Sequence, residues 1–246
     1  MISNIYYTIL YEPFYNILVF LAHIVPGADI GISVVILTIF VRLIISPLSH
    51  KQIHTQRKMK AMEGEMTLVK KKFENDKNEQ TRQIMELYKK HGVNPFSGFL
   101  LILIQIPILL ALYFVFTRGI PFTTTHLYSF LTLPGQINFE FLGLIDLGAK
   151  SITMALLVGV SQYFQISLAL PPSAPKKEGD SKNFGEELAK SMNTNMRYVM
   201  PVIIAFVTAS FPAVVGLYWL TSNLFSIGHE LIVRRKAKII SAPTPT

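Results

Sequence analysis

The sequence predicts an all-α polytopic membrane protein with a core of five transmembrane helices, and three observations point to that class. Half of the 246 residues are hydrophobic, and only 15% are charged, whereas a soluble domain usually carries about 25%. The apolar residues form runs long enough to cross a bilayer. The basic residues, which bring the net charge to +8, collect between these runs. This pattern excludes a disordered chain and argues against an ordinary soluble enzyme.

The first apolar run, residues 5–25, allows two placements. It is long enough to span a bilayer, but three polar residues and a proline interrupt it: Glu12, Pro13, Asn16 and His23. An amphipathic helix that lies in the membrane interface fits the same residues. No Lys or Arg precedes the run, so the basic start of a secretory signal is missing. Both placements leave the topology of the later helices unchanged.

The second apolar run, residues 30–46, contains a single charge, Arg42. At about 1.5 Å per residue it is just long enough to cross a slightly thin bilayer. Because proline lacks the backbone N–H that a helix interior needs, we expect Pro47 to end this helix.

Residues 48–94 differ in kind, with eleven Lys or Arg and six Asp or Glu. Apolar residues recur at helical spacing on both sides of the polar sequence ENDKNE, which predicts a hairpin of two short amphipathic helices. The residues on the two apolar faces are Met62, Met66, Val69 and Phe73, then Ile84, Leu87 or Tyr88, and His91. We expect Gly92 to end the second helix, and Asn94 and Pro95 to begin the next one.

Two more runs, residues 96–117 and 151–170, are typical of transmembrane helices. Pro107 is expected to kink the first of them. The loop between them, residues 118–150, has Phe-rich apolar patches and four charges that cancel. The polar stretch 171–197, with its Pro, Gly and Lys residues, is typical of a flexible loop.

The last apolar stretch, residues 198–233, is about 54 Å long as a straight helix, too long for one span and short for two. Pro212 marks a turn within it. Two helices, at about 194–209 and 213–233, return the basic tail RRKAK to the side of the other basic segments, whereas one helix would leave it opposite them. We therefore predict two short helices.

Charge placement then sets the orientation. The basic segments 50–94, 171–197 and 234–246 hold 20 of the 23 Lys and Arg residues, and all three face the cytoplasm if helix 30–46 runs from outside to inside. The net charge is thus a topology signal, and nucleic-acid binding is not needed to explain it. The predicted division is an outer-leaflet amphipathic helix 1–27, transmembrane helix 28–47, cytoplasmic hairpin 48–94, transmembrane helix 95–118, outer loop 119–150, transmembrane helix 151–170, cytoplasmic loop 171–193, transmembrane helices 194–210 and 211–233, and cytoplasmic tail 234–246.

Arg42 is the most informative single residue, because an arginine in hydrocarbon costs about 2.5–3.5 kcal/mol on insertion scales. A polar stripe at helical spacing runs along its helix: Thr38, Arg42, Ser46 and Ser49. Two interpretations stay open. The side chain can snorkel to the inner interface, which is about 7.5 Å away at Pro47. Alternatively, it lines a water-filled cavity that holds a positive charge.

Other predicted helices carry polar residues that suit such a cavity: Gln105, Gln162, Gln165, Tyr218, Trp219, Ser222, Asn223 and Ser226. For any one Gln or Ser, an interhelical hydrogen bond worth about 0.6 kcal/mol is a sufficient explanation. Trp219 as an interface anchor is a weaker alternative, since it lies near the middle of its segment. Several polar faces around one arginine favour a shared cavity.

Enzyme classes find no support in the sequence. The absence of cysteine excludes disulfides, thiolate catalysis and Cys-ligated zinc. No phosphate-binding or dinucleotide-binding glycine pattern and no G-x-S-x-G elbow occurs. The pair His50 and His54 has helical spacing, but no acidic residue is placed to complete a metal site. We expect no catalytic residue, no metal and no cofactor.

Three segments closely resemble the YidC-type membrane protein insertases of the Oxa/Alb/YidC superfamily, from about residue 10 to residue 236. They are SVVILTIFVRLIISPLSHKQ, KHGVNPFSGFLLILIQIPILLALYFVF and FPAVVGLYWLTSNLFSIGHELIVRR. The resemblance implies a five-helix core with a hydrophilic groove open to cytoplasm and lipid. It also favours residues 10–25 lying flat on the outer leaflet. By position, Arg42 matches the groove arginine, Gln105 the glutamine of the second helix, Tyr218 and Trp219 the substrate-facing aromatic pair, and Asn223 the asparagine that follows.

The implied function is a membrane protein insertase in a bacterial plasma membrane. Its partners would be nascent membrane proteins and the lipid bilayer. Residues 48–94 and the basic tail are candidates to contact the Sec translocon, a ribosome or a targeting factor. Two alternatives remain open from the residues alone: an assembly chaperone that does not insert, and a small-anion transporter that uses Arg42.

Overall fold

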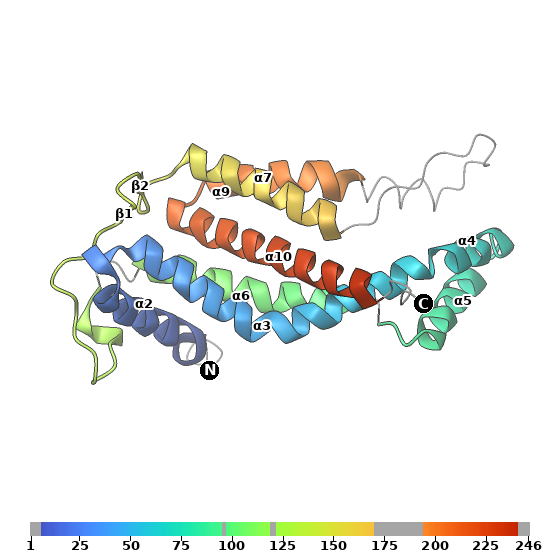
Figure 1. Cartoon of the computed structure of the whole chain (residues 1–246), viewed down its shortest axis with the longest axis horizontal. Helices are drawn as coiled ribbons and strands as arrows, with labels where there is room; N and C mark the ends of the chain where they lie inside the picture. Colours follow the sequence, from blue (N-terminus) through green and yellow to red (C-terminus); the bar gives the residue numbers. More distant parts are fainter. Residues whose placement is uncertain (1–5, 95–96, 119–121, 170–193, 241–246) are drawn as a thin grey trace.

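The computed structural model describes residues 6–94, 97–118, 122–169 and 194–240, and within them the chain is mostly helical. Long helices run side by side along the molecule, with α4 and α5 at one end and the strands at the other (Figure 1). The helices are α2 (Glu12–Ile24), α3 (Ile30–Ala61), α4 (Glu63–Lys72), α5 (Lys77–Lys90), α6 (Ser97–Arg118), α7 (Ile152–Ala169), α9 (Met200–Ala209) and α10 (Ala213–Ile240). Two short strands, β1 (Glu140–Phe141) and β2 (Ile145–Asp146), pair antiparallel.

The main apolar core lies where α2, α3, α6 and α10 meet. Its members include Tyr15, Leu18, Val34, Leu37, Ala111, Val115, Val214 and Leu217, each at most 3% exposed. The helix α10 is central, since it contacts α3, α6, α7 and α9. This position allows α10 to present polar side chains toward several helices at once.

Helix α3 begins at an acidic cap. One carboxylate oxygen of Asp29, Oδ1, accepts hydrogen bonds from the backbone N–H groups of Gly31 and Ile32, at 2.7 and 3.1 Å. The other, Oδ2, accepts from the N–H of Leu142 at 2.9 Å. A carboxylate at this position satisfies N–H groups that have no partner within the helix and interacts favourably with the helix dipole. Asp29 therefore ties the loop after α6 to the start of α3.

The expectation that Pro47 ends this helix is wrong, because α3 continues through Pro47 to Ala61. Proline removes one backbone hydrogen bond, and packing against a neighbouring helix offsets that loss. The contact with α10 continues past the proline, where the rings of His50 and His229 lie 6.0 Å apart. Ser49 also donates its hydroxyl to the carbonyl of Ile45, at 3.4 Å.

Helices α4 and α5 form the two amphipathic helices that the spacing predicts within residues 48–94, and they pack against each other. Their small core contains Met62, Leu87 and Val93, and burial raises the pKa of the neighbouring Tyr88 phenol. Gly92, which follows the C-cap residue of α5, has a φ of +60°, which confirms its predicted role in ending that helix. The cytoplasmic location of this pair of helices stays a prediction.

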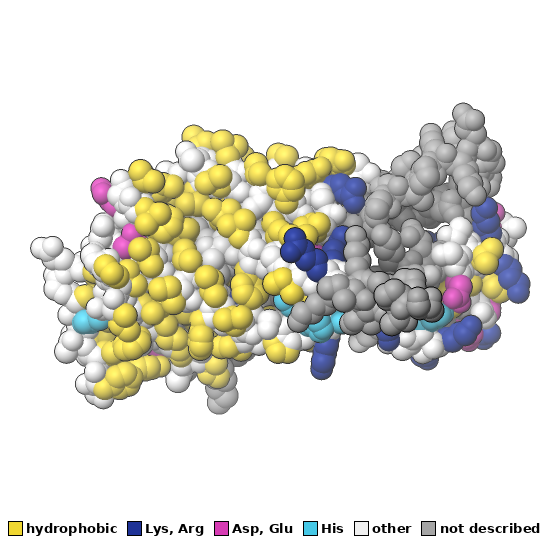
Figure 2. Space-filling model, viewed as in Figure 1, with side chains coloured by type: hydrophobic (Ala, Val, Ile, Leu, Met, Phe, Trp, Pro, Cys, Tyr) yellow, Lys and Arg dark blue, Asp and Glu magenta, His cyan; other side chains and the backbone are white. Residues whose placement is uncertain are grey.

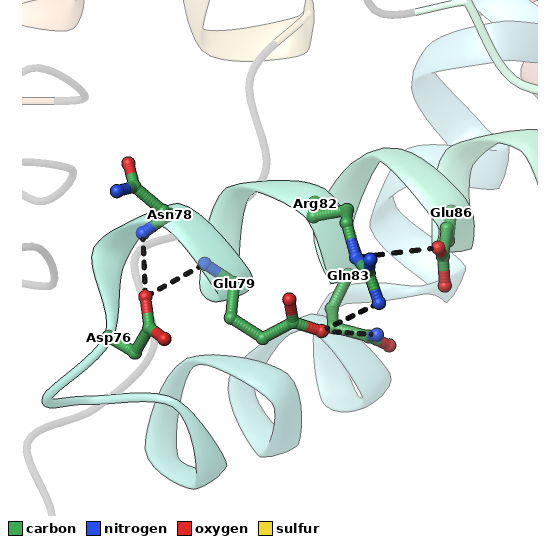
Figure 3. Close-up of polar contacts among 6 residues, drawn as sticks. All are labelled: Asp76, Asn78, Glu79, Arg82, Gln83 and Glu86. Atoms are coloured by element: carbon green, nitrogen blue, oxygen red, sulfur yellow. Dashed lines mark hydrogen bonds and ion pairs between the residues drawn. The ribbon is translucent and has the colours of Figure 1, made fainter.

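The start of α5, after the turn from α4, is held by polar contacts (Figure 3). The carboxylate of Asp76 accepts hydrogen bonds from the N–H groups of Asn78 and Glu79 and so caps the helix. Arg82 lies 3.2 Å from Glu79 and 3.8 Å from Glu86. Exposed pairs of this kind add little stability, so the cap contributes more to the local fold than the pairs do.

The predicted turn at Pro212 is confirmed, since α9 ends at Ala209 and α10 begins at Ala213. The break is held by the loop between α6 and α7: the N–H of Ala213 donates to the carbonyl of Ala149 at 2.8 Å. The second of these helices is longer than predicted, because α10 runs to Ile240 and takes in the start of the basic tail. Near that end Arg234 donates to Glu230, one turn earlier, at 2.7 Å, and to the carbonyl of Leu168 in α7.

The surface separates apolar from charged residues along the long axis. Hydrophobic side chains cover most of the visible face over the long helices, and Lys and Arg gather toward the end that carries α4 and α5 (Figure 2). Among the residues that the structure describes, two helical segments have the length and hydropathy of a membrane span, Ile30–Met59 and Ile152–Ala169. An all-α membrane protein fits these features, and the count of five spans stays a prediction.

Gly31 offers a test of how closely the β-hairpin packs on α3. A Cβ atom at this position would overlap the ring of Phe141, and overpacking of this kind typically costs about 1–3 kcal/mol. We expect Gly31→Ala to lower the free energy of unfolding, measured by circular dichroism in an SDS titration of mixed micelles. Gly64→Ala is the control, because a Cβ there meets nothing within 4 Å and alanine favours a helix. Equal stability of the two variants would contradict the packing argument.

Candidate functional site

Arg42 lies in the last third of the apolar run 30–46 of α3, one turn after Thr38. Its side chain is half-buried, and its Nε atom is buried without a hydrogen-bond partner among the described residues. Thr38 is 1% exposed and donates its hydroxyl to the carbonyl of Val34 at 2.6 Å, and it makes no hydrogen bond with the arginine Nε. No ion pair in the described ranges involves Arg42, which leaves its charge available to a ligand.

The surface of α3 around Arg42 is apolar. Phe40, Leu43 and Ile44 are 54%, 55% and 63% exposed, which is the exposure expected of residues that face lipid. Arg42 is therefore a charged side chain in apolar surroundings, where its charge costs free energy, and its Nε has no hydrogen-bond partner among the described residues. Snorkelling of its side chain stays open as an alternative to a water-filled cavity.

Tyr218 on α10 links this arginine to α6. Its ring is 3% exposed, and its hydroxyl accepts a hydrogen bond of 2.6 Å from Nε2 of Gln105. Arg42 lies close enough for its charge to act on this hydroxyl. Ser222 is buried one turn later on α10. Three helices thus bring Arg42, Gln105 and Tyr218 into one polar group, which we call the arginine-side network.

A second polar group, the α7-side network, lies between α10 and α7. Trp219 donates its indole N–H to Oε1 of Gln162 at 3.0 Å, and Nε2 of Gln162 donates to Oε1 of Gln165 at 2.8 Å. One turn further along α10, Asn223 donates to the hydroxyl of Ser161 at 3.0 Å. The indole of Trp219 is therefore held by a chain of side-chain amides.

The predicted site residues are brought together around α10, but on two of its sides. Consecutive residues of a helix point about 100° apart. Tyr218 accordingly contacts α6, and Trp219 contacts α7. A single groove that joins the two networks stays a prediction. Within these two networks, the sequence analysis did not name Ser161, which accepts the hydrogen bond of Asn223 and is 5% exposed. Ser161 lies one turn before Gln165, so helical spacing from that glutamine was the sequence feature that could have revealed it.

The histidine pair predicted on one helix face is in contact. Nε2 of His54 lies 3.1 Å from Nε2 of His50, and α10 adds His229, whose ring is 6.0 Å from that of His50. Among the residues that the structure describes, no group of three His, Asp or Glu side chains is arranged to hold a metal ion. The histidines provide no argument for metal chemistry here.

The hydrogen bond to Trp219 can be tested by fluorescence, because the chain has a single tryptophan. Gln162→Leu removes the acceptor of the indole N–H, so we expect the emission of Trp219 to shift to shorter wavelength. The free energy of unfolding should fall by only about 0.6 kcal/mol, the average for polar contacts between membrane helices. Gln165→Leu keeps the acceptor and should shift the emission less. An equal shift in the two variants would contradict the arrangement.

Comparison with known sequences agrees with these features. Residues 20–240 match the profile of the 60Kd inner membrane protein family. Among similar proteins, one from Fusobacterium nucleatum is 32% identical over 229 residues, which cover 90% of this chain and 97% of that protein. Another from Clostridium perfringens is 32% identical over 92% of this chain and 87% of that protein. A third from Clostridium tetani is 27% identical over 85% and 84%. Each of these three carries the name membrane protein insertase YidC.

Proposed function

This chain belongs to the 60Kd inner membrane protein family, and on that premise we propose that it is a membrane protein insertase of the YidC type. In the proposed reaction, hydrophobic segments of nascent proteins and their short acidic outer tails pass into the bilayer through a hydrophilic groove. No covalent chemistry and no cofactor take part. The observation that carries the proposal is the buried, unpartnered Nε of Arg42 on an apolar helix of a chain from this family.

In the first step, Arg42 attracts the acidic tail of the client. Two opposite charges 4 Å apart interact by about 1 kcal/mol in water and about 4 kcal/mol at an effective dielectric constant of 20. A half-buried arginine therefore attracts a carboxylate more strongly than an exposed one. The absence of an ion pair to Arg42 in the described residues supports its availability to the client.

In the second step, polar side chains replace water around the tail while it crosses. Tyr218 interacts with Arg42 and accepts a hydrogen bond from Gln105, and the amides of Gln162 and Gln165 provide further donors and acceptors. The client's hydrophobic segment then leaves past Tyr218 and Trp219 toward lipid. Short apolar helices such as α9, with ten residues, favour local thinning of the bilayer and so shorten the crossing.

The proposed partners are nascent membrane proteins and lipid, in a bacterial plasma membrane. The basic segments, residues 50–94, 171–197 and 234–246, are proposed to face the cytoplasm. There the pair α4–α5 and the tail would receive a client from the Sec translocon, a ribosome or a targeting factor. Residues 170–193 and 241–246 lie outside the described residues, so this part of the proposal rests on charge placement alone.

The direct test uses the purified chain in liposomes with a translating client. A photo-crosslinking amino acid is placed at position 42 or 219, and at position 206 as a control, since Phe206 is 77% exposed on α9. The client has a neutral tail, so that the loss of the Arg42 charge does not obscure the result. We expect crosslinks from 42 and 219 and none from 206, together with protection of the client's outer tail from added protease.

The same preparation separates the alternatives. Crosslinks without protection of the tail would indicate an assembly chaperone that does not insert. Flux of a small anion across the liposome membrane, without crosslinks, in the variant labelled at 219, which keeps Arg42, would indicate a transporter that uses Arg42. That second function is a candidate because an unpaired arginine also suits a small anion. Either outcome would overturn the insertase proposal.

A further inference from the structure

The turn between β1 and β2 exposes two leucines. Leu142 is 60% exposed and Leu144 is 82% exposed, and only Gly143 separates them. We call these three residues the leucine tip. A hairpin turn in water usually carries Gly, Asn, Asp or Ser, because these residues are polar or tolerate unusual backbone angles. The leucine tip is therefore apolar where turn chemistry favours polar residues.

The backbone of the leucine tip is also strained. Leu142 has a φ of +54°, in the left-handed region that bulky side chains rarely adopt. The strain is held in place by Asp29, whose Oδ2 accepts the N–H of Leu142 at 2.9 Å. An asparagine or a glycine would relieve the strain at this position. Strain that is held in place by its surroundings gathers at functional sites, which makes Leu142 a candidate for a role beyond folding.

The base of the hairpin is fixed on the helical core. Phe141 pairs with Ile145 across the two strands, and both pack against the main apolar core. The exposed acidic residues Glu140 and Asp146 form the next pair, further from the turn. The hairpin thus holds an apolar tip on a rigid, partly acidic base.

The leucine tip continues the apolar surface of α7. Leu144 lines a cavity of about 460 Å³ together with Ser151 and Thr153, so the tip lies beside the start of that helix. From there an exposed apolar row follows α7 at every fourth residue: Ile152, Leu156, Val160 and Phe164, from 75% to 55% exposed. Ile152–Ala169 has the length and hydropathy of a membrane span. The row therefore faces lipid, and the tip lies where it ends.

We propose that the leucine tip inserts into the lipid bilayer at the boundary of headgroups and acyl chains, beside the start of α7. The occupant is a lipid surface, because the tip is continuous with the exposed row of α7 and lies at the end of the molecule opposite α4 and α5 (Figure 1). Inserted, the two leucines anchor the outer loop and fix the depth of the start of α7. This inference rests on the membrane placement of α7 and not on insertase activity.

The absence of cysteine makes the depth of the tip measurable without background labelling. A nitroxide is attached to Leu144→Cys in the full chain, which is reconstituted in nanodiscs of phosphatidylethanolamine and phosphatidylglycerol. Collisions with oxygen, which concentrates in lipid, are compared with collisions with a water-soluble nickel chelate. The control label is at Gln136→Cys, an exposed polar position of the same loop.

The label at 144 is expected to meet oxygen more often, and the nickel chelate less often, than the label at 136. Equal access of the nickel chelate to both labels would overturn the proposal.

A second variant separates insertion from folding: Leu142→Asn suits the left-handed backbone and keeps the turn. In that background the label at 144 should gain access to the nickel chelate without any loss of thermal stability. Unchanged access would contradict a role of Leu142 in the anchor. A protein with Arg42→Ala should give the same depths, so failure of the insertase proposal would be recognised separately.

Discussion

Replacing Arg42 by alanine is expected to lower the insertion of clients with an acidic outer tail by about tenfold or more. A tenfold loss corresponds to about 1.4 kcal/mol, which is less than the roughly 4 kcal/mol that a close charge pair contributes at an effective dielectric constant of 20. The measurement is protease protection of the client's tail in liposomes that contain the purified variant. Since Arg42 makes no ion pair in the described residues, its removal leaves no buried acid behind, and the fold should survive.

Two controls identify the charge as the cause. Arg42→Lys keeps a positive charge and should retain most of the insertion activity, although it loses the fork of donors of a guanidinium. A client with a neutral tail should insert equally well with arginine or alanine at position 42. Several clients of each kind are needed, because clients differ in how much they depend on an attractive charge. If the alanine variant inserts acidic-tailed clients as well as the unchanged protein does, the charge mechanism is wrong for them.

Helix identity was predictable from the sequence, whereas some helix ends were not. The spacing of apolar residues predicted α4 and α5, long apolar runs predicted α6 and α7, and Pro212 predicted the break between α9 and α10. The prediction that Pro47 ends α3 was wrong, because proline ends a helix more readily when no neighbouring helix packs against it. The contact between α3 and α10 around His50 and His229 joins residues far apart in sequence, and no local pattern reveals it.

The composition of the site was more predictable than its arrangement. A polar residue in an apolar run is visible in the sequence, and so Arg42, Gln105 and Gln162 could be named in advance. Which side chains meet depends on how each helix is rotated about its axis. That rotation is set by packing at positions such as Gly216, where a Cβ would meet Met154. Only the structure therefore shows that Tyr218 hydrogen-bonds to Gln105 and that Trp219 hydrogen-bonds to Gln162.

Tyr218 is the residue whose truncation should have the largest effect on stability. Its ring is 3% exposed in the core between α3, α6 and α10, and removal of a buried aromatic ring costs about 3–5 kcal/mol. We expect Tyr218→Ala to lower the free energy of unfolding by about this amount, measured by circular dichroism in an SDS titration. Tyr218→Phe keeps the ring and loses only the hydroxyl, so its loss should stay near 0.6 kcal/mol, roughly the average for a polar contact between membrane helices. A similar loss in both variants would show that the ring is not packed as described.

The phenylalanine variant also tests whether Gln105 and Tyr218 act as one unit beside Arg42. If the 2.6 Å hydrogen bond joins them, each single change already breaks it, and the double change has no further bond to lose. The losses in Gln105→Leu and Tyr218→Phe should then sum to more than the loss in the double variant, both in stability and in insertion of acidic-tailed clients. Strict additivity would mean that the two side chains act independently.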